Sequence, residues 1–164
     1  MAVATDIAAM YRAPRQTVRR LLTMGVREDR ALLYLMLACA LIFVAQWPRL
    51  AREAHLDAAV PLDARIGGAL LAWFFLAPLL LYAVAAITRL AARLLGGRGT
   101  WYTARLALFW SLLAAAPMWL LSGLAAGFLG PGGALQGVSA LALGVFLVFW
   151  GLALLETERP TMLA

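Results

Sequence analysis

The sequence contains no lysine, a single cysteine and a single histidine among its 164 residues. One cysteine, Cys39, excludes an internal disulfide and any metal site built from several cysteines. The histidine, His55, stands near three acidic residues, but a solvated polar loop explains this segment better than a metal site, because no second histidine or neighbouring cysteine completes a ligand set. The sequence therefore predicts no metal ion and no other cofactor.

Charged residues are scarce as well, at 13% of the chain, whereas 65% of the residues are hydrophobic and the mean hydropathy is +0.87. An ordinary soluble domain has about 25% charged and 45–50% apolar residues. Four runs carry no charge and are long enough to cross a bilayer as helices, and they lack the alternation of a membrane barrel. The predicted fold is an all-α integral membrane protein with four transmembrane helices, at about 31–48, 66–88, 106–129 and 134–155.

No charged residue or histidine lies inside these four runs. This absence argues against a proton relay, an ion pump or a carrier of charged substrates, because such proteins hold ionisable side chains within the membrane. The serines of the runs also have no acid or histidine inside the runs to activate them as nucleophiles. We therefore expect a protein without catalytic activity.

The first run could be a cleaved signal peptide, since Arg27 and Arg30 precede it. It is longer than a usual signal core and no convincing cleavage site follows, so a retained helix is expected. With four spans, eleven arginines lie on the side of both termini and three on the other side. The positive-inside rule then places the N-terminal segment 1–30 and the tail 156–164 in the cytoplasm, flanking a membrane domain at 31–155.

The N-terminal segment contains an amphipathic stretch, with apolar residues at steps of three or four and arginines on the opposite arc. Pro14 interrupts it, so two short helices or one kinked helix are expected. This segment fits a helix that lies on the membrane surface, and it also fits a docking helix for a cytoplasmic partner.

Arginines beside the runs are expected to contact anionic lipid head groups, at about 1 kcal/mol each near an anionic surface. The predicted contacts are Arg12, Arg15, Arg19, Arg20, Arg89, Arg93, Arg98 and Arg105. The second helix is expected to continue past Thr88 and to end at Gly96-Gly97, with Arg89 and Arg93 snorkelling to the phosphates. Because the arginines lie beside apolar runs and form no separate patch, nucleic acid is not an expected partner.

Prolines and small residues indicate how the helices are shaped and packed. Pro78 and Pro117 lie near the centres of the second and third runs and are expected to kink them, although such interruptions can also mark a transport site. Small residues allow close helix contact in lipid, either inside the chain or with a second membrane protein. The predicted packing positions are Gly123, Gly127, Gly137, Ala140, Gly144 and Gly151, placed in a hairpin of the third and fourth helices.

From Arg93 onward, the string RLLGGRGTWYTARLALFWSLLAAAPMWLLSGLAAGF resembles the central part of bacterial members of the Yip-one (Ypt-interacting protein) domain family. The shared features are the glycines Gly96, Gly97 and Gly99, and an aromatic-serine pair, Trp110-Ser111, before the proline at 117. The resemblance implies a polytopic helical protein of the bacterial inner membrane with a cytoplasmic N-terminus. Four spans replace the five usual in eukaryotic relatives, so GTPase binding is not carried over.

These observations favour a non-catalytic inner-membrane protein that organises the bilayer or membrane-protein assemblies through helix packing and a basic cytoplasmic face. The expected partners are the lipid bilayer, its anionic head groups, and other membrane proteins or a second copy of the chain. The alternative is a small oligomeric permease that moves an apolar or lipid-like substrate past Pro78 and Pro117. A continuous polar lining would distinguish the permease from the organising protein.

Overall fold

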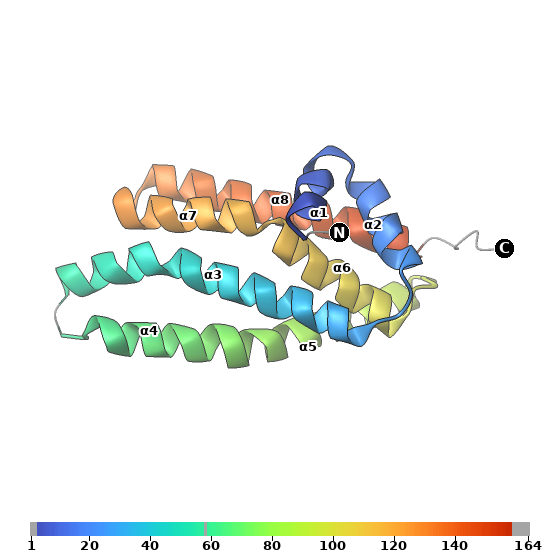
Figure 1. The fold of residues 1–164 in the computed structure, drawn as a ribbon, viewed down its shortest axis with the longest axis horizontal. Coiled ribbons are helices and arrows are strands. Elements are labelled where there is room, and N and C mark those ends of the chain that lie inside the picture. Colours follow the sequence, from blue (N-terminus) through green and yellow to red (C-terminus); the bar gives the residue numbers. More distant parts are fainter. Residues whose placement is uncertain (1–2, 58, 159–164) are drawn as a thin grey trace.

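The computed structural model describes residues 3–57 and 59–158, and this part of the chain is helical, with turns and no strand (Figure 1). Short N-terminal helices precede the long ones. The elements are α1 (Val3–Arg12), α2 (Pro14–Thr23), α3 (Glu28–Leu56), α4 (Leu62–Leu71), the π-helical turn η1 (Ala72–Leu76), α5 (Ala77–Leu94), α6 (Trp101–Ala114), α7 (Ala116–Phe128) and α8 (Gly133–Glu158). The predicted all-helical class is confirmed, whereas the predicted tail falls largely on 159–164, outside the described residues.

Three helices are long and apolar enough to cross a membrane: α3, the continuous helix Leu62–Leu94, and α8. The pair α6 and α7 meets the same test as one unit, but it is bent by 46° at its break, so the described chain has three or four candidate spans. The apolar run predicted as the first span, 31–48, lies within α3, which continues beyond Pro48 to Leu56. An ion pair of 2.8 Å between Arg49 and Glu53, one turn apart, supports this extension beyond the apolar run.

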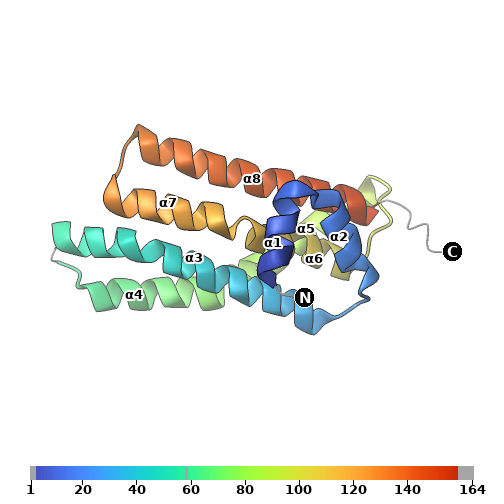
Figure 2. The same cartoon turned by 45° about the horizontal axis from the view of Figure 1, so that its top comes forward.

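The helices α8, α7, α3 and α4 follow one another across one half of the molecule (Figures 1 and 2). In the other half, α6 packs against α3, α5 and α8, while α2 lies on the end of α8. The segment Leu106–Ala116 is buried throughout. By contrast, α4 has no buried residue. The bundle is therefore tightly packed around α6 and open around α4.

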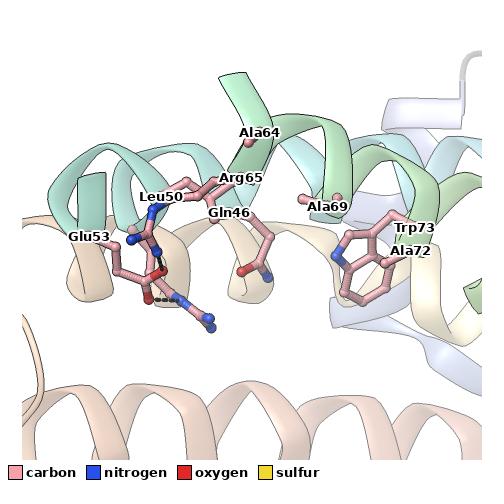
Figure 3. Close-up of a pocket in the computed structure, with 10 residues that line it drawn as sticks. Gln46, Leu50, Glu53, Ala64, Arg65, Ala69, Ala72 and Trp73 are labelled. Atoms are coloured by element: carbon pink, nitrogen blue, oxygen red, sulfur yellow. Dashed lines mark hydrogen bonds and ion pairs between the residues drawn. The ribbon is translucent and has the colours of Figure 1, made fainter. Parts of the chain in front are cut away.

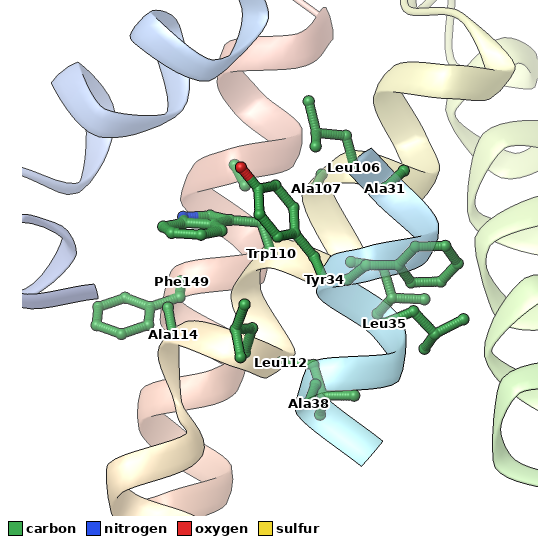
Figure 4. Close-up of a cluster of buried hydrophobic side chains, with 14 of the residues drawn as sticks. Ala31, Tyr34, Leu35, Ala38, Leu106, Ala107, Trp110, Leu112, Ala114 and Phe149 are labelled. Atoms are coloured by element: carbon green, nitrogen blue, oxygen red, sulfur yellow. The ribbon is translucent and has the colours of Figure 1, made fainter. Parts of the chain in front are cut away.

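Aromatic and small side chains fill the packed half (Figure 4). Trp110 of α6 meets Tyr34 of α3 edge to face, with 4.9 Å between ring centroids. Phe149 of α8 meets Tyr11 of α1 in the same manner at 5.0 Å. Such aromatic pairs contribute about 0.5–1.5 kcal/mol beyond the area that they bury. One pair joins α3 to α6 and the other joins α1 to α8, and Tyr34, Trp110 and Phe149 all belong to one buried cluster.

The two mid-run prolines have different effects. Pro117 stands near the start of α7, directly after the bend at Ala115, as expected for a residue that lacks an N–H and clashes with the preceding turn. Pro78 follows η1, where the Ala77 N–H donates to the Ala72 carbonyl, five residues earlier. A π-helical turn changes the hydrogen-bond register without ending the helix, so the second span continues past Pro78.

The bend at Pro117 leaves the Ala114 carbonyl without its helical N–H donor, and a side chain of α1 supplies a hydrogen bond to it. The Met118 N–H, which would reach Ala114 in a continuous helix, donates to the Ala115 carbonyl at 2.9 Å. The hydroxyl of Tyr11 donates to the Ala114 carbonyl at 3.1 Å. Burial raises the pKa of the Tyr11 phenol, which favours the protonated donor. The break between the apolar helices α6 and α7 thus has its polar group met by another helix of the same chain, as a break inside a bilayer would require.

The predicted glycine stop after the second span is confirmed. α5 ends at Leu94, and Gly96 has a φ of +82°, a left-handed conformation that favours glycine. The Gly97 N–H donates to the Ala92 carbonyl at 2.8 Å and the Gly96 N–H to the Arg93 carbonyl at 3.1 Å. This pair of bonds is the Schellman motif, which ends a helix and satisfies its last carbonyls.

Candidate functional site

The amphipathic N-terminal segment folds back onto the bundle. Pro14 begins α2 after a break at Ala13, as the sequence predicts. Met10, Val18 and Leu21 are buried to at least 96% and belong to the same core cluster as α6 and α8. The chain itself therefore covers the centre of this apolar face, while Tyr11 remains 41% exposed. The structure shows the segment docked on its own bundle, and contact of its remaining surface with lipid or with a cytoplasmic partner stays a prediction.

A buried carboxylate fixes α2 in place. The side chain of Glu156, near the end of α8, is 2% exposed and lies 2.8 Å from the Arg19 Nε and 3.6 Å from the Arg15 Nε. Each arginine remains about half exposed. A second ion pair, between Arg20 of α2 and Asp6 of α1, joins the two short helices. The basic arc of the segment is thus partly neutralised by acids of the same chain.

A second carboxylate near the end of α8, that of Glu158, closes the loop between α5 and α6. Its Oε2 accepts a hydrogen bond of 2.8 Å from the Gly99 N–H and lies 3.5 Å from Arg89. A Cβ at Gly97 or Gly99 would collide with this carboxylate, so both glycines permit the close approach. The Arg89 side chain is only 11% exposed. The mostly buried Arg89 side chain thus contacts a carboxylate of its own chain, and its contact with lipid phosphates stays a prediction.

The remaining predicted lipid contacts divide into two groups. Arg105 forms an ion pair with Glu28 and lies over the ring of Tyr82, 5.9 Å from its centroid. Three others are exposed and form no ion pair with any residue that the structure describes: Arg12, Arg93 and Arg98. These three have guanidinium groups free for head groups, and their contact with lipid stays a prediction.

The opposite end of the bundle contains an open polar cleft of about 530 Å³ between α3 and α4 (Figure 3). Glu53 accepts from Arg49 at 2.8 Å and lies 3.4 Å from Arg65 of α4. Gln46 and Trp73 line the same cleft farther along the helices. The two arginines exceed the one acid, so the lining carries a net positive charge.

A smaller cleft of about 180 Å³ lies among α3, α7 and α8 and shares Gln46 and Arg49 with the first. Ser122 of α7 and Ser139 of α8 face it and are hydrogen-bonded to each other at 2.9 Å. The Nε1 atom of Trp119, another lining residue, is buried without a hydrogen-bond partner in the described part of the chain. We refer to these two neighbouring clefts, which share Gln46 and Arg49 and have polar groups on several walls, as the crevice.

The small residues fall into two sets with opposite surroundings. A Cβ at Gly123 would lie 2.7 Å from the carbonyl carbon of Ala45, and one at Gly127 would lie 2.9 Å from that of Pro48. These glycines therefore permit close contact between α7 and α3. By contrast, no described atom lies within 4 Å of a Cβ built at Gly137, Gly144 or Gly151.

The predicted hairpin packing is thus corrected. α7 and α8 do lie side by side, but the close-contact glycines of α7 face α3 and the glycines of α8 face outward. Ala140 is exposed on α8 as well. A glycine pattern identifies a close-contact face without identifying its partner, which explains the misassignment.

Sequence analysis missed Glu156 and Glu158 as partners of the basic segments. The sequence did contain a signal for this pairing. Glu156 and Glu158 are the last two described acids and directly follow an apolar run. The positive-inside rule assigns most arginines to the same side of the membrane, where they are available as partners. The crevice had no comparable signal, since Gln46, Ser122 and Ser139 are scattered over three helices.

No family model, curated protein or solved structure matches this chain.

Proposed function

We propose that the chain is a non-catalytic polytopic membrane protein of the Yip-one type, with four transmembrane helices and both termini in the cytoplasm of a bacterium. In this proposal, α6 and α7 form one bent span of the inner membrane. The protein organises the bilayer or other membrane proteins through helix packing and a basic cytoplasmic surface. That surface consists of α1, α2, the loop between α5 and α6, and the last turn of α8.

The docking of α1 and α2 onto the bundle is the observation that carries this proposal. Glu156 and the buried residues Met10, Val18 and Leu21 hold the short helices at fixed positions. Arg12 of α1 is therefore presented on a rigid support beside the spans, and Arg93 at the end of α5 and Arg98 in the following loop extend the same basic surface. At about 1 kcal/mol per arginine near an anionic surface, these three would supply roughly 3 kcal/mol of attraction. This strength suits reversible recruitment of anionic lipid.

The test replaces Arg12, Arg93 and Arg98 together by glutamine. Wild type, extracted in mild detergent, should retain phosphatidylglycerol or cardiolipin, and native mass spectrometry should find fewer such lipids on the glutamine variant. The matched control replaces the same three residues by lysine, which keeps the charge. Equal retention of anionic lipid by the glutamine variant would refute the basic surface, and crosslinking in native membranes would then identify any protein partner independently.

A second candidate function is supported by the crevice around Gln46. Its polar groups lie at the loosely packed end of the bundle, while the opposite end is closed by α1, α2 and α6. A lipid-like substrate could place its polar head in the crevice and its chains in the surrounding bilayer. This arrangement supplies the polar lining that a permease for such a substrate requires.

Proteoliposomes with a fluorescent phospholipid and a membrane-impermeant quencher distinguish the two candidates. A permease should move the lipid between leaflets faster than protein-free vesicles do, and Gln46→Leu should slow this movement. Gln136→Leu is the matched control, because Gln136 is exposed at the start of α8 and lies outside both clefts. Lipid movement equal to that of protein-free vesicles would exclude the permease.

A further inference from the structure

An apolar groove of about 420 Å³ runs along α8 beside α1. One wall is the ring of Tyr11, and the other wall and the floor come from α8 between Ala140 and Phe149. The floor is deep at Gly144, where no described atom lies within 4 Å of the position that a Cβ would take. The groove lies apart from the crevice around Gln46 and shares no lining residue with it.

The groove lies on the N-terminal side of Glu156 along α8, at a distance from the ion pairs that Glu156 forms with α2. Gly144 precedes Glu156 by twelve residues in the same helix, which corresponds to about 18 Å at a rise of about 1.5 Å per residue. Phe149 precedes Glu156 by about 10 Å on the same scale. In the proposed bilayer the groove therefore begins near the interface and extends into the hydrocarbon region.

Positive charge lies beyond the Phe149 end of the groove, because Arg15 pairs with Glu156, seven residues after Phe149 in α8. Arg12 follows Tyr11 directly in the chain, is exposed, and forms no ion pair with a residue that the structure describes. Arg15 is also half exposed, although Glu156 partly neutralises it. A cation above an apolar groove matches an amphiphile that has an anionic head and a hydrocarbon chain.

We propose that this groove binds one acyl chain of an anionic phospholipid whose phosphate contacts Arg12. The inference rests on the proposed placement of the basic surface at the membrane and adds a defined site to it. Within a bilayer, moving an acyl chain into an apolar groove gains little free energy from apolar burial alone. The favourable binding free energy comes from close packing of the acyl chain against Gly144 and Tyr11 and from the charge-assisted contact of the phosphate with Arg12.

The test uses the full chain in phosphatidylcholine vesicles that contain a photoreactive phosphatidylglycerol with the reactive group in an acyl chain. Peptide mapping should place the crosslink between Ala140 and Phe149 or at Tyr11. Gly144→Leu fills the floor and should reduce this crosslink about fivefold, which corresponds to about 1 kcal/mol at 25 °C. Gly137→Leu is the matched control, because Gly137 is equally open but does not line the groove.

The head-group contact has its own comparison. Arg12→Gln should reduce the preference of the groove for the phosphatidylglycerol probe over a phosphatidylcholine probe, whereas Arg27→Gln, at an exposed arginine between α2 and α3 that does not line the groove, should leave that preference unchanged. Crosslinks that survive Gly144→Leu, or that map elsewhere on the chain, would overturn the site while the basic surface still retains anionic lipid. A crosslinked dimer joined through Gly144 would overturn it in favour of a second copy. If the wild type retains no anionic lipid, the proposed function fails as well.

Discussion

Two chemically identical substitutions should have opposite effects on stability. In Gly123→Ala, the added Cβ would lie 2.7 Å from the carbonyl carbon of Ala45 and closer still to its oxygen. Carbon atoms pack at about 3.5–4.0 Å, so α7 must move away from α3 by about 1 Å. Rotation of a side chain cannot relieve the clash, because the obstacle is backbone. In Gly144→Ala, the new methyl group meets no described atom within 4 Å.

The magnitudes follow from two terms. Overpacking costs about 1–3 kcal/mol, and the backbone clash at Gly123 places it at the upper end. Replacing a helical glycine by alanine gains up to about 1 kcal/mol at either position. We therefore expect Gly123→Ala to lower the free energy of unfolding by about 2 kcal/mol and Gly144→Ala to raise it by up to about 1 kcal/mol. For a chain of this size, the two Tm values should differ by about 6–12 °C.

Cys39 supplies the assay. It is the single cysteine of the chain and is fully buried, so a thiol-reactive dye reports its exposure when the protein unfolds in detergent. The dye should react at a lower temperature in Gly123→Ala than in wild type, and at the same or a higher temperature in Gly144→Ala. The reverse order would refute the reasoning, because it would place the close helix contact on α8 instead of between α3 and α7.

Three further predictions follow from contacts at the packed end and from the charge distribution. Tyr11→Phe keeps the ring but loses the bond to the Ala114 carbonyl, and should lower the free energy of unfolding by about 1 kcal/mol in the same dye assay; unchanged stability would contradict that bond. Glu156→Gln should cost about 1–2 kcal/mol, since its arginine partners are half exposed. It should also speed tryptic cleavage between α2 and α3, and unaltered cleavage would argue against the docking of α2. Finally, a cysteine placed at Arg98 should be protected from an external thiol reagent while one placed at Asp57 is labelled, and the reverse pattern would invert the proposed topology.

The helical class and the approximate positions of the long helices follow from the sequence, because hydropathy reports which segments avoid water. Hydropathy predicts the ends of the helices less well, because a helix can continue beyond its apolar residues. The run that ends at Pro48 marks where the apolar residues stop, but α3 continues to Leu56, with an ion pair between Arg49 and Glu53 one turn apart. By contrast, the end of α5 was predictable, since the left-handed turn at Gly96 requires the residue type that the sequence supplies.

Contacts between distant segments were harder to predict for a physical reason. The glycines of α7 recur after four residues, and Gly137, Gly144 and Gly151 of α8 recur after seven, so each set shares one helix face, yet only the first set touches another backbone. Likewise, the pattern of arginines in α2 is the same for a helix on lipid and for one docked on Glu156. Local periodicity determines which residues share a face, whereas the partner of that face depends on how all the helices are arranged. The structure supplies this arrangement for α2 and α7.

The ion pair between Arg19 and Glu156 also bears on the order of events during synthesis. The two residues are 137 positions apart, so α1 and α2 emerge from the ribosome long before the end of α8 exists. During that interval the apolar face with Met10, Val18 and Leu21 lacks its final cover, and the membrane surface is the nearest apolar phase. In the proposed membrane protein, the same amphipathic pattern would let α1 and α2 lie on the membrane surface while α8 is still being made. Only a completed α8 offers Glu156 as the partner of Arg19.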